Sequence, residues 1–130
     1  MKTQVVVDKK KRQIICTAFA NGKTHDFKLF KQSGIHARPE TKLDTDTGYL
    51  GIKKIHANSE HPIKGSKYHK LTECEKQFNR QISPDRVLNE HVIGFIKRFK
   101  IVADKYRNRR KRFGLRLNLI AGICNFESAI

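Results

Sequence analysis

Two apolar runs joined by a block of charge open the chain and restrict its fold more than any other feature. Residues 3–7 read TQVVV, residues 13–20 read QIICTAFA, and every residue from 8 to 12 is charged. Apolar side chains fill consecutive positions in both runs, which is the pattern of strands that are covered on both faces. We therefore expect a β-hairpin with a packing layer on each side.

Short elements are expected after the hairpin. The pattern predicts a helix at 25–33, a short strand at 41–46 that leads into a Thr-Gly-Tyr turn, and a brief helix at 51–58. Residues 59–70 contain a proline and a glycine and indicate a loop or a poor edge strand.

Helices are expected in the second half. Thr72 and Glu75 form the pattern of a capping box, which marks a helix start. Ser83 followed by Pro84 predicts that the helix restarts there, with serine as its N-cap and proline in its first turn. The order of strand, strand, helix, strand and helices is an α/β plan. A length of 130 residues makes one domain, spanning 1–130.

Apolar spacing defines the inner faces of two helices. From 85 to about 102, the apolar positions recur with helical spacing, at Leu88, Val92, Phe95, Ile96 and Phe99. A last helix is expected over about 108–126, with one apolar side made of Phe113, Leu117, Ile120 and Cys124.

The charge balance points to a polyanionic partner. Lys and Arg number 28 and Asp and Glu number 12, which gives a formal charge of +16, while 38% hydrophobic residues still allow a core. Nucleic acid fits best and an anionic membrane surface is the alternative, although no apolar run approaches the roughly 20 residues of a membrane span. Three dispersed cysteines without a C-x-x-C motif suit a reducing compartment such as the cytoplasm.

The basic residues are densest between 97 and 116, where ten cations accompany one acid. If about six of them contact phosphates, the affinity for DNA falls steeply with salt. The predicted phosphate-contacting residues of this segment are Lys97, Arg98, Lys100, Arg107, Arg109, Arg110, Lys111 and Arg112. A merely solubilising charge run is the alternative.

One face of the long helix carries a carboxylate between two cations. At about 100° per residue, Arg86, Glu90 and Lys97 lie within about 40° of one another, opposite the apolar stripe. An ordinary i,i+4 ion pair on a solvated face is the alternative interpretation. Arg before Glu is the less favourable order for such a pair, and Gly94 at the edge of this face suits close approach by another molecule.

A second carboxylate, Asp46, follows the short predicted strand. Carboxylates at strand ends of α/β sheets lie where ligands bind, although a turn-forming Asp before Thr-Gly is the simpler alternative. Mg²⁺ or Mn²⁺ takes few protein carboxylates together with waters and phosphate oxygens. Asp46 and Glu90 are therefore the candidate metal ligands and catalytic residues.

Four segments of the chain resemble the DDE transposases of bacterial insertion sequences, which are related to the Harbinger-like endonucleases. They are HDF at 25–27, DTGYLGI at 46–52, NRQISPDRVLNEHVIGFIKRFKI at 79–101 and KYRNRRKRFGLRLNLIAGICN at 105–125. The family signature Tyr-x-x-Arg-x-x-x-Glu-x(6)-Lys maps onto Arg86, Glu90 and Lys97, with Ser83 in place of the tyrosine.

The resemblance implies an RNase H-like fold and metal-dependent DNA cleavage and strand transfer. It makes Asp46 the second acid of the catalytic triad and Glu90 the third, with Arg86 and Lys97 near DNA phosphates. It places the first acid on a central strand that precedes residue 1, so we expect an incomplete fold that is inactive alone. The implied partners are DNA and either the missing N-terminal part or a full-length transposase, in a nucleoid-associated protein.

Two non-catalytic alternatives stay open. The first is a basic DNA-binding module, and the second is a regulatory fragment that competes with a full-length transposase. Carboxylates within a positive surface repel phosphate, so a pure binder gains nothing from Asp46 or Glu90. The two carboxylates therefore separate the catalytic hypothesis from the first alternative.

Overall fold

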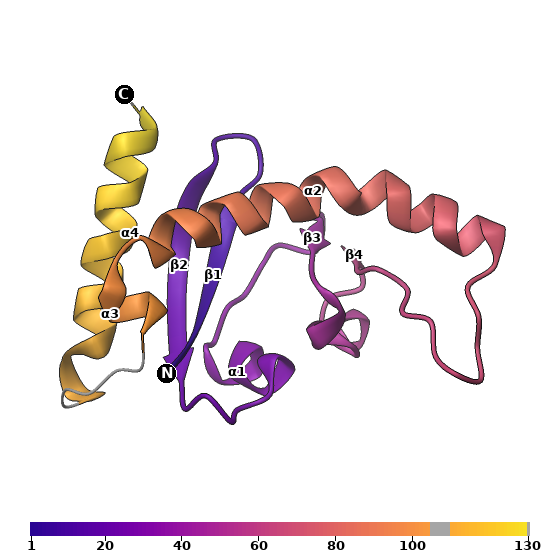
Figure 1. Ribbon diagram of the computed structural model, residues 1–130, viewed down its shortest axis with the longest axis horizontal. Helices are drawn as coiled ribbons and strands as arrows, with labels where there is room; N and C mark the ends of the chain where they lie inside the picture. Colours follow the sequence, from indigo (N-terminus) through magenta and orange to yellow (C-terminus); the bar gives the residue numbers. More distant parts are fainter. Residues whose placement is uncertain (105–109, 130) are drawn as a thin grey trace.

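A computed structural model of the protein describes residues 1–104 and 110–129. Strands β1 (Lys2–Asp8) and β2 (Gln13–Ala20) form the predicted antiparallel hairpin (Figure 1), with a bulge between Val6 and Val7. Asp8 begins the charged turn by accepting hydrogen bonds from the backbone N–H groups of Lys10 and Lys11. The bond from Lys11 lowers the pKa of Asp8, because it favours the charged carboxylate.

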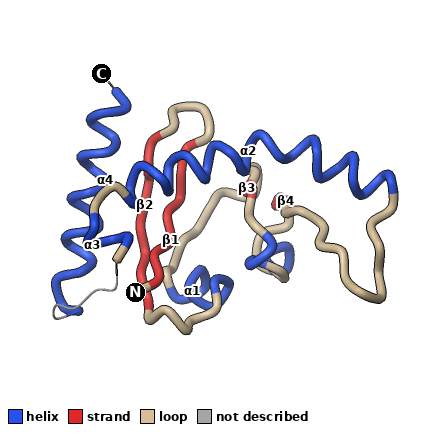
Figure 2. The backbone as a smooth tube through the Cα atoms, viewed as in Figure 1, coloured by secondary structure: helices blue, strands red, loops and turns tan. Residues whose placement is uncertain are grey.

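The middle of the chain is built from short elements that connect the hairpin to the long helix. They are α1 (Asp26–Gln32), β3 (Leu43–Asp44), the 3₁₀ helices η1 (Thr47–Tyr49) and η2 (Ile52–Lys54), and β4 (Ser59–Glu60). Strands β3 and β4 pair in parallel, so the expected edge strand exists as a two-residue segment. Within the described residues, this pair and the hairpin form two separate sheets, as Figure 2 shows.

Helix α2 (Glu73–Lys97) begins with the predicted capping box, but the predicted restart at Ser83 is wrong. Pro84 lies inside one continuous helix, although proline there removes a backbone hydrogen bond. Contacts on both sides of Pro84 hold the helix: Asn79 binds the backbone of Ile63, and Asp85 binds Lys9.

The last helices also differ from their predicted bounds. Helix α2 ends at Lys97 rather than near 102, because Phe99 adopts an extended conformation and caps the short helix α3 (Lys100–Ala103). The final helix α4 spans Phe113–Ala129 and follows the 3₁₀ helix η3 (Arg110–Arg112). The first two positions of the predicted helix, 108 and 109, lie outside the described residues.

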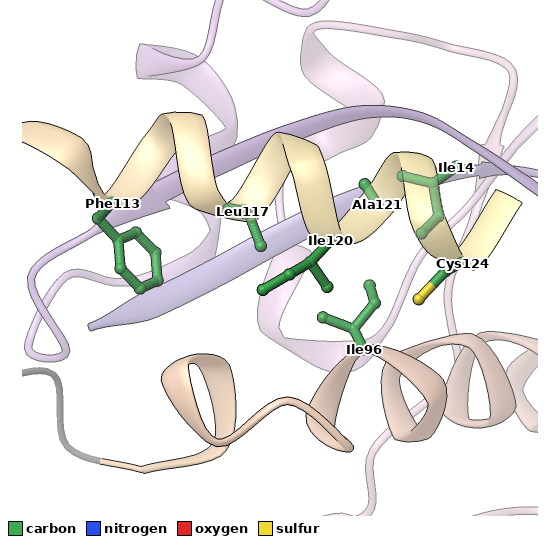
Figure 3. Close-up of a cluster of buried hydrophobic side chains, with 7 residues drawn as sticks. All are labelled: Ile14, Ile96, Phe113, Leu117, Ile120, Ala121 and Cys124. Atoms are coloured by element: carbon green, nitrogen blue, oxygen red, sulfur yellow. The ribbon is translucent and has the colours of Figure 1, made fainter. Parts of the chain in front are cut away.

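The main core lies where α4 and the end of α2 meet one face of the hairpin. In Figure 3, side chains of α4 point toward Ile96 of α2. The buried cluster consists of Ile14, Ile96, Phe113, Leu117, Ile120, Ala121 and Cys124. The predicted inner side of α4 is confirmed, whereas Phe95 of the predicted α2 stripe is 46% exposed and carries the Arg98 guanidinium on its ring.

The opposite face of the hairpin is covered by α1 and η1. Gln4 is buried on β1, and its side-chain oxygen accepts a hydrogen bond from the Tyr49 hydroxyl of η1. The Tyr49 ring meets the buried Phe30 of α1 edge-on. Both faces of the hairpin therefore contact packed elements, as its consecutive apolar residues predict, but Ile15 of β2 is 65% exposed.

Candidate functional site

Asp46 lies between the end of strand β3 at Asp44 and the start of the 3₁₀ helix η1 at Thr47. It is the N-cap of η1, and its Oδ1 accepts a hydrogen bond of 2.7 Å from the backbone N–H of Thr47. The side chain is 62% exposed. Asp46 therefore fulfils the turn-forming role that was the alternative interpretation, while its carboxylate still faces solvent.

The structure brings Asp46 to the predicted charged face of α2. Arg86 Nη2 lies 3.4 Å from Asp46 Oδ1, which joins residues 40 positions apart in the sequence. Glu90 is exposed one helical turn beyond Arg86. The hydrogen bond with Thr47 and the ion pair with Arg86 both use Oδ1 of Asp46.

Lys9 holds the strand end against the helix. Its ammonium lies 2.6 Å from Asp85 of α2 and 3.3 Å from Asp44 of β3. These contacts raise the pKa of Lys9, and the hydrogen bond with Asp85 is the largest cause. Lys9 of the hairpin turn thus links Asp44 of β3 to Asp85 of α2, which directly precedes Arg86.

A polar layer supports the Asp46 turn from the hairpin side. Lys2 pairs with Asp26 at 2.9 Å, and Asp26 lies against Gly48, where an added Cβ would be 2.5 Å from Asp26 Oδ2. Burial raises the pKa of Tyr49 to about 12, and the carboxylates of Asp26 and Asp46 add to this effect. Only glycine fits at position 48 without moving Asp26.

The predicted phosphate-contacting residues are spread along the far end of α2 and beyond it. Lys97 ends α2 and is exposed, as is Lys100 of α3. Arg98 is engaged within the molecule, because it pairs with Glu127 and stacks on Phe95, and the contact with Glu127 raises its pKa. Lys111 and Arg112 of η3 are exposed.

Two of the predicted cations, Arg107 and Arg109, lie outside the described residues. Arg110 begins η3, where the structure describes the backbone only. The spatial arrangement of the basic segment is therefore given by Lys97, Lys100, Lys111 and Arg112.

The candidate site offers the type of ligand atom that hard divalent cations bind. Asp46 and Glu90 offer carboxylate oxygens, which are the ligands that Mg²⁺ and Mn²⁺ prefer. Among residues 1–104 and 110–129, no group of three or more His, Cys, Asp or Glu side chains could hold a metal. Two acids leave room for waters and for substrate oxygens, which Mg²⁺ usually retains.

Sequence reasoning missed the supporting residues Lys2, Gln4, Lys9 and Asp26. One signal was available: Gln4 is a polar residue within the apolar run TQVVV, and such a residue is buried only with a partner. Lys9 carried no such signal, because it is one of four consecutive cations in the turn.

Comparison with known proteins identifies the family of the chain. Residues 1–125 match the DDE superfamily endonucleases, and the chain belongs to this family. Endonucleases of this superfamily use divalent metal ions. The resemblance inferred from the four sequence segments is therefore confirmed.

A curated relative narrows the comparison to insertion sequences. The chain is 48% identical over 130 residues to a protein of Microchaete diplosiphon described as a probable transposase for insertion sequence element IS702. The match covers 100% of this chain and 47% of the relative, so the chain spans about half of the relative's length. No solved structure gives a significant match. No helix in the described part of the chain is long and apolar enough to cross a membrane.

Proposed function

We propose that this chain carries the second and third acids of a DDE transposase, Asp46 and Glu90, within an RNase H-like domain. Its substrate is DNA, and its reaction is the metal-dependent cleavage and strand transfer of transposition. The observation that carries this proposal is the Asp46–Arg86 pair, which joins the strand end to the helix face that bears Glu90. An ordinary i,i+4 ion pair between Arg86 and Glu90 on a solvated face would not explain why the carboxylate of Asp46, from a distant turn, also lies at this face.

Each residue of this face has a separate task in the proposal. Asp46 and Glu90 hold Mg²⁺ or Mn²⁺, which when bound stabilises negative charge on the oxygens of a phosphodiester. Arg86 keeps Asp46 oriented before DNA arrives and then contacts phosphate, since its pair with Asp46 is half exposed and weak. Lys97, about 16 Å from Arg86 along α2, contacts a phosphate further along the DNA.

We further propose that the first acid is supplied from outside residues 1–130, so that this chain alone does not cleave DNA. The resemblance implies that this acid lies on a central strand that precedes β1 in the sequence and pairs between β1 and β3 in the sheet. In the described structure these strands belong to separate two-stranded sheets, which supports the proposal. The acid would come from an N-terminal transposase part or from a full-length transposase. We propose that the protein is cytoplasmic and nucleoid-associated.

Metal binding tests the assignment of the two acids. Titration of the 1–130 chain with Mn²⁺, followed by the electron paramagnetic resonance of the free ion, should show weak binding. Asp46→Asn and Glu90→Gln should each reduce that binding at least about tenfold. The control is Asp104→Asn, which removes an exposed acid outside the site. Unchanged Mn²⁺ binding in both site variants would refute the assignment.

DNA nicking tests the need for an external acid. The 1–130 chain should give no Mg²⁺- or Mn²⁺-dependent nicking of supercoiled DNA. Robust nicking that is lost in Glu90→Ala would contradict this part of the proposal, while it would support the role of Glu90.

The net charge of +16 favours one alternative, a non-catalytic basic DNA-binding or regulatory fragment. If about six cations contact phosphates, log K should fall with log salt at a slope near −5. In a pure binder, Asp46→Asn and Glu90→Gln should strengthen DNA binding with or without metal, because each removes a negative charge. In a metal site, both variants should abolish the stimulation of DNA binding by Mn²⁺.

A further inference from the structure

The segment between β4 and α2, residues 61–71, forms a loop with an aromatic side chain at its tip, which we term the Tyr68 loop (Figure 1). The backbone N–H of Ser66 donates to the carbonyl of His69 at 2.8 Å, and the N–H of His69 donates back to Ser66 at 3.3 Å. These bonds close a tight turn whose two central residues are Lys67 and Tyr68. Tyr68 is 94% exposed, so folding buries almost none of its ring.

The base of the Tyr68 loop is fixed to α2 at two points. Asn79 of α2 accepts a hydrogen bond of 2.8 Å from the N–H of Ile63 and donates one of 2.9 Å to its carbonyl. On the other side of the turn, the ring of His69 lies 3.3 Å from Oε1 of Glu75. Tyr68 is therefore presented by a preformed loop, so little ordering is needed when it meets another molecule.

Both attachment points lie on the face of α2 that carries the candidate site. At about 100° per residue, Glu75 and Asn79 lie about 20° on either side of Arg86, and Glu90 lies about 40° from Arg86. Glu75 precedes Glu90 by about 22 Å along the helix. A DNA strand that runs along this face from the candidate acids toward the start of α2 therefore meets the Tyr68 loop.

The charge of the Tyr68 loop fits a phosphate backbone. Lys64, Lys67 and Lys70 are exposed, and the loop contains no acid. Glu60 and Glu73, the acids that flank the loop, pair with lysines outside it. Among the residues that the structure describes, no ion pair holds any of the three loop lysines. The three ammonium groups are therefore available to phosphates.

We propose that the Tyr68 loop is a second DNA contact, in which the Tyr68 ring stacks on an unpaired base and the three loop lysines contact the phosphates beside it. This inference rests on the proposed function, because it takes DNA as the molecule that lies along this face of α2. Aromatic rings stack on the bases of single strands with little regard to sequence, whereas the bases of an intact duplex already stack on one another. The loop therefore selects DNA with unpaired bases.

DNA binding without metal tests the stacking contact. Fluorescence anisotropy at about 0.1 M salt gives the dissociation constants of the 1–130 chain for a labelled single strand and for its duplex. Tyr68→Ala should weaken binding to the single strand about tenfold and to the duplex less than about twofold. Tyr68→Phe keeps the ring and should bind both forms as the wild type does. The control is Phe126→Ala, which removes an aromatic side chain that is 70% exposed on α4 and should change neither constant.

Salt dependence tests the loop lysines separately. Lys67→Gln should reduce the slope of log K against log salt by about 0.7 on the single strand, because one phosphate contact is lost. Tyr68→Ala removes no charge and should leave the slope unchanged. The matched control is Lys10→Gln, at an exposed lysine of the hairpin turn, which should change the slope less. Equal changes in Lys67→Gln and Lys10→Gln would contradict the proposed phosphate contact.

The stacking contact can fail while the proposed function stands. If Tyr68→Ala binds single-stranded DNA as the wild type does, or loses affinity equally for both forms, the stacking contact is overturned. Mn²⁺ binding at Asp46 and Glu90 does not involve the loop and should be unchanged in Tyr68→Ala. A wild type that binds neither form of DNA would overturn this inference together with the proposed function. Unchanged DNA binding combined with weaker binding to anionic phospholipid vesicles would assign the loop to a membrane surface instead.

Discussion

The two ends of the molecule are held by different forces. At the hairpin–α4 end (β1, β2, α4 and the last turns of α2), seven buried residues form one apolar cluster. At the β3–β4 end (β3, β4, η1 and the first half of α2), ion pairs such as those of Lys9 with Asp44 and Asp85 join the elements. Asp46 lies at this second end, while Glu90 lies in the second half of α2, and both carboxylates are open to water.

This contrast suits a site that meets a polyanion. Apolar burial is insensitive to salt and holds the scaffold, whereas exposed ion pairs are screened and can exchange partners. The Arg86–Asp46 pair is of this exposed kind, because the Arg86 side chain is 45% exposed in it. The variants below compare how strongly the two ends are held, and they are given in order of decreasing expected loss of stability.

Leu117→Ala should cause the largest loss of stability. Leu117 is 1% exposed in the main cluster, and truncating such a residue leaves a cavity that costs about 3 kcal/mol. Leu115→Ala, two residues earlier on the exposed side of α4, should cost less than about 1 kcal/mol. Urea unfolding at low protein concentration measures both. Equal losses would mean that α4 does not pack as described.

Gly48→Ala should destabilise the β3–β4 end by about 1–2 kcal/mol, because the new methyl group meets the Asp26 carboxylate. Gly22→Ala is the matched control, since a Cβ there meets no heavy atom within 4 Å. Combining Gly48→Ala with Asp26→Ala in one chain should recover part of the loss. Urea unfolding of the wild type, Gly48→Ala, Asp26→Ala and the double variant measures this coupling. Purely additive effects would exclude the proposed contact.

Lys9→Met should cost about 1 kcal/mol and should act locally, because it removes the cation shared by Asp44 and Asp85. Hydrogen exchange should speed up at the Leu43 and Thr45 amides, which bond to the β4 segment. Lys10→Met removes the neighbouring exposed cation and should leave these amides unchanged. An equal increase in hydrogen exchange at amides throughout the chain would show that Lys9 does not act locally.

Acid should loosen the start of α2 before the apolar cluster. The N–H of Thr72 donates to Glu75 and lowers its pKa below the usual 4.5, so the capping box contributes fully above that pH. This contribution is lost as the pH falls through the lowered pKa of the folded state. Amide exchange at residues 73–78 should therefore increase below about pH 4 in the wild type. Glu75→Gln should remove most of this pH dependence, and a persistent dependence would point to another group.

Much of the local structure could be predicted from the sequence, because its signals lie within a few residues. The charged turn, the capping box at Thr72 and the inner side of α4 depend on near neighbours and on helical spacing. The break at Ser83 was predicted wrongly for the same reason. Local chemistry favours a new helix start before Pro84, while the contacts of Asn79 and Asp85 with distant segments keep α2 continuous.

Composition and periodicity were enough to predict a basic α/β chain, its hairpin and its candidate acids, because these signals are contained in short segments. Tertiary structure alone decided that Asp46 meets Arg86, that Lys9 ties the hairpin to β3 and α2, and that one side of α4 stays uncovered. These contacts join residues tens of positions apart. Their distances follow from how the whole chain packs, which no short segment encodes.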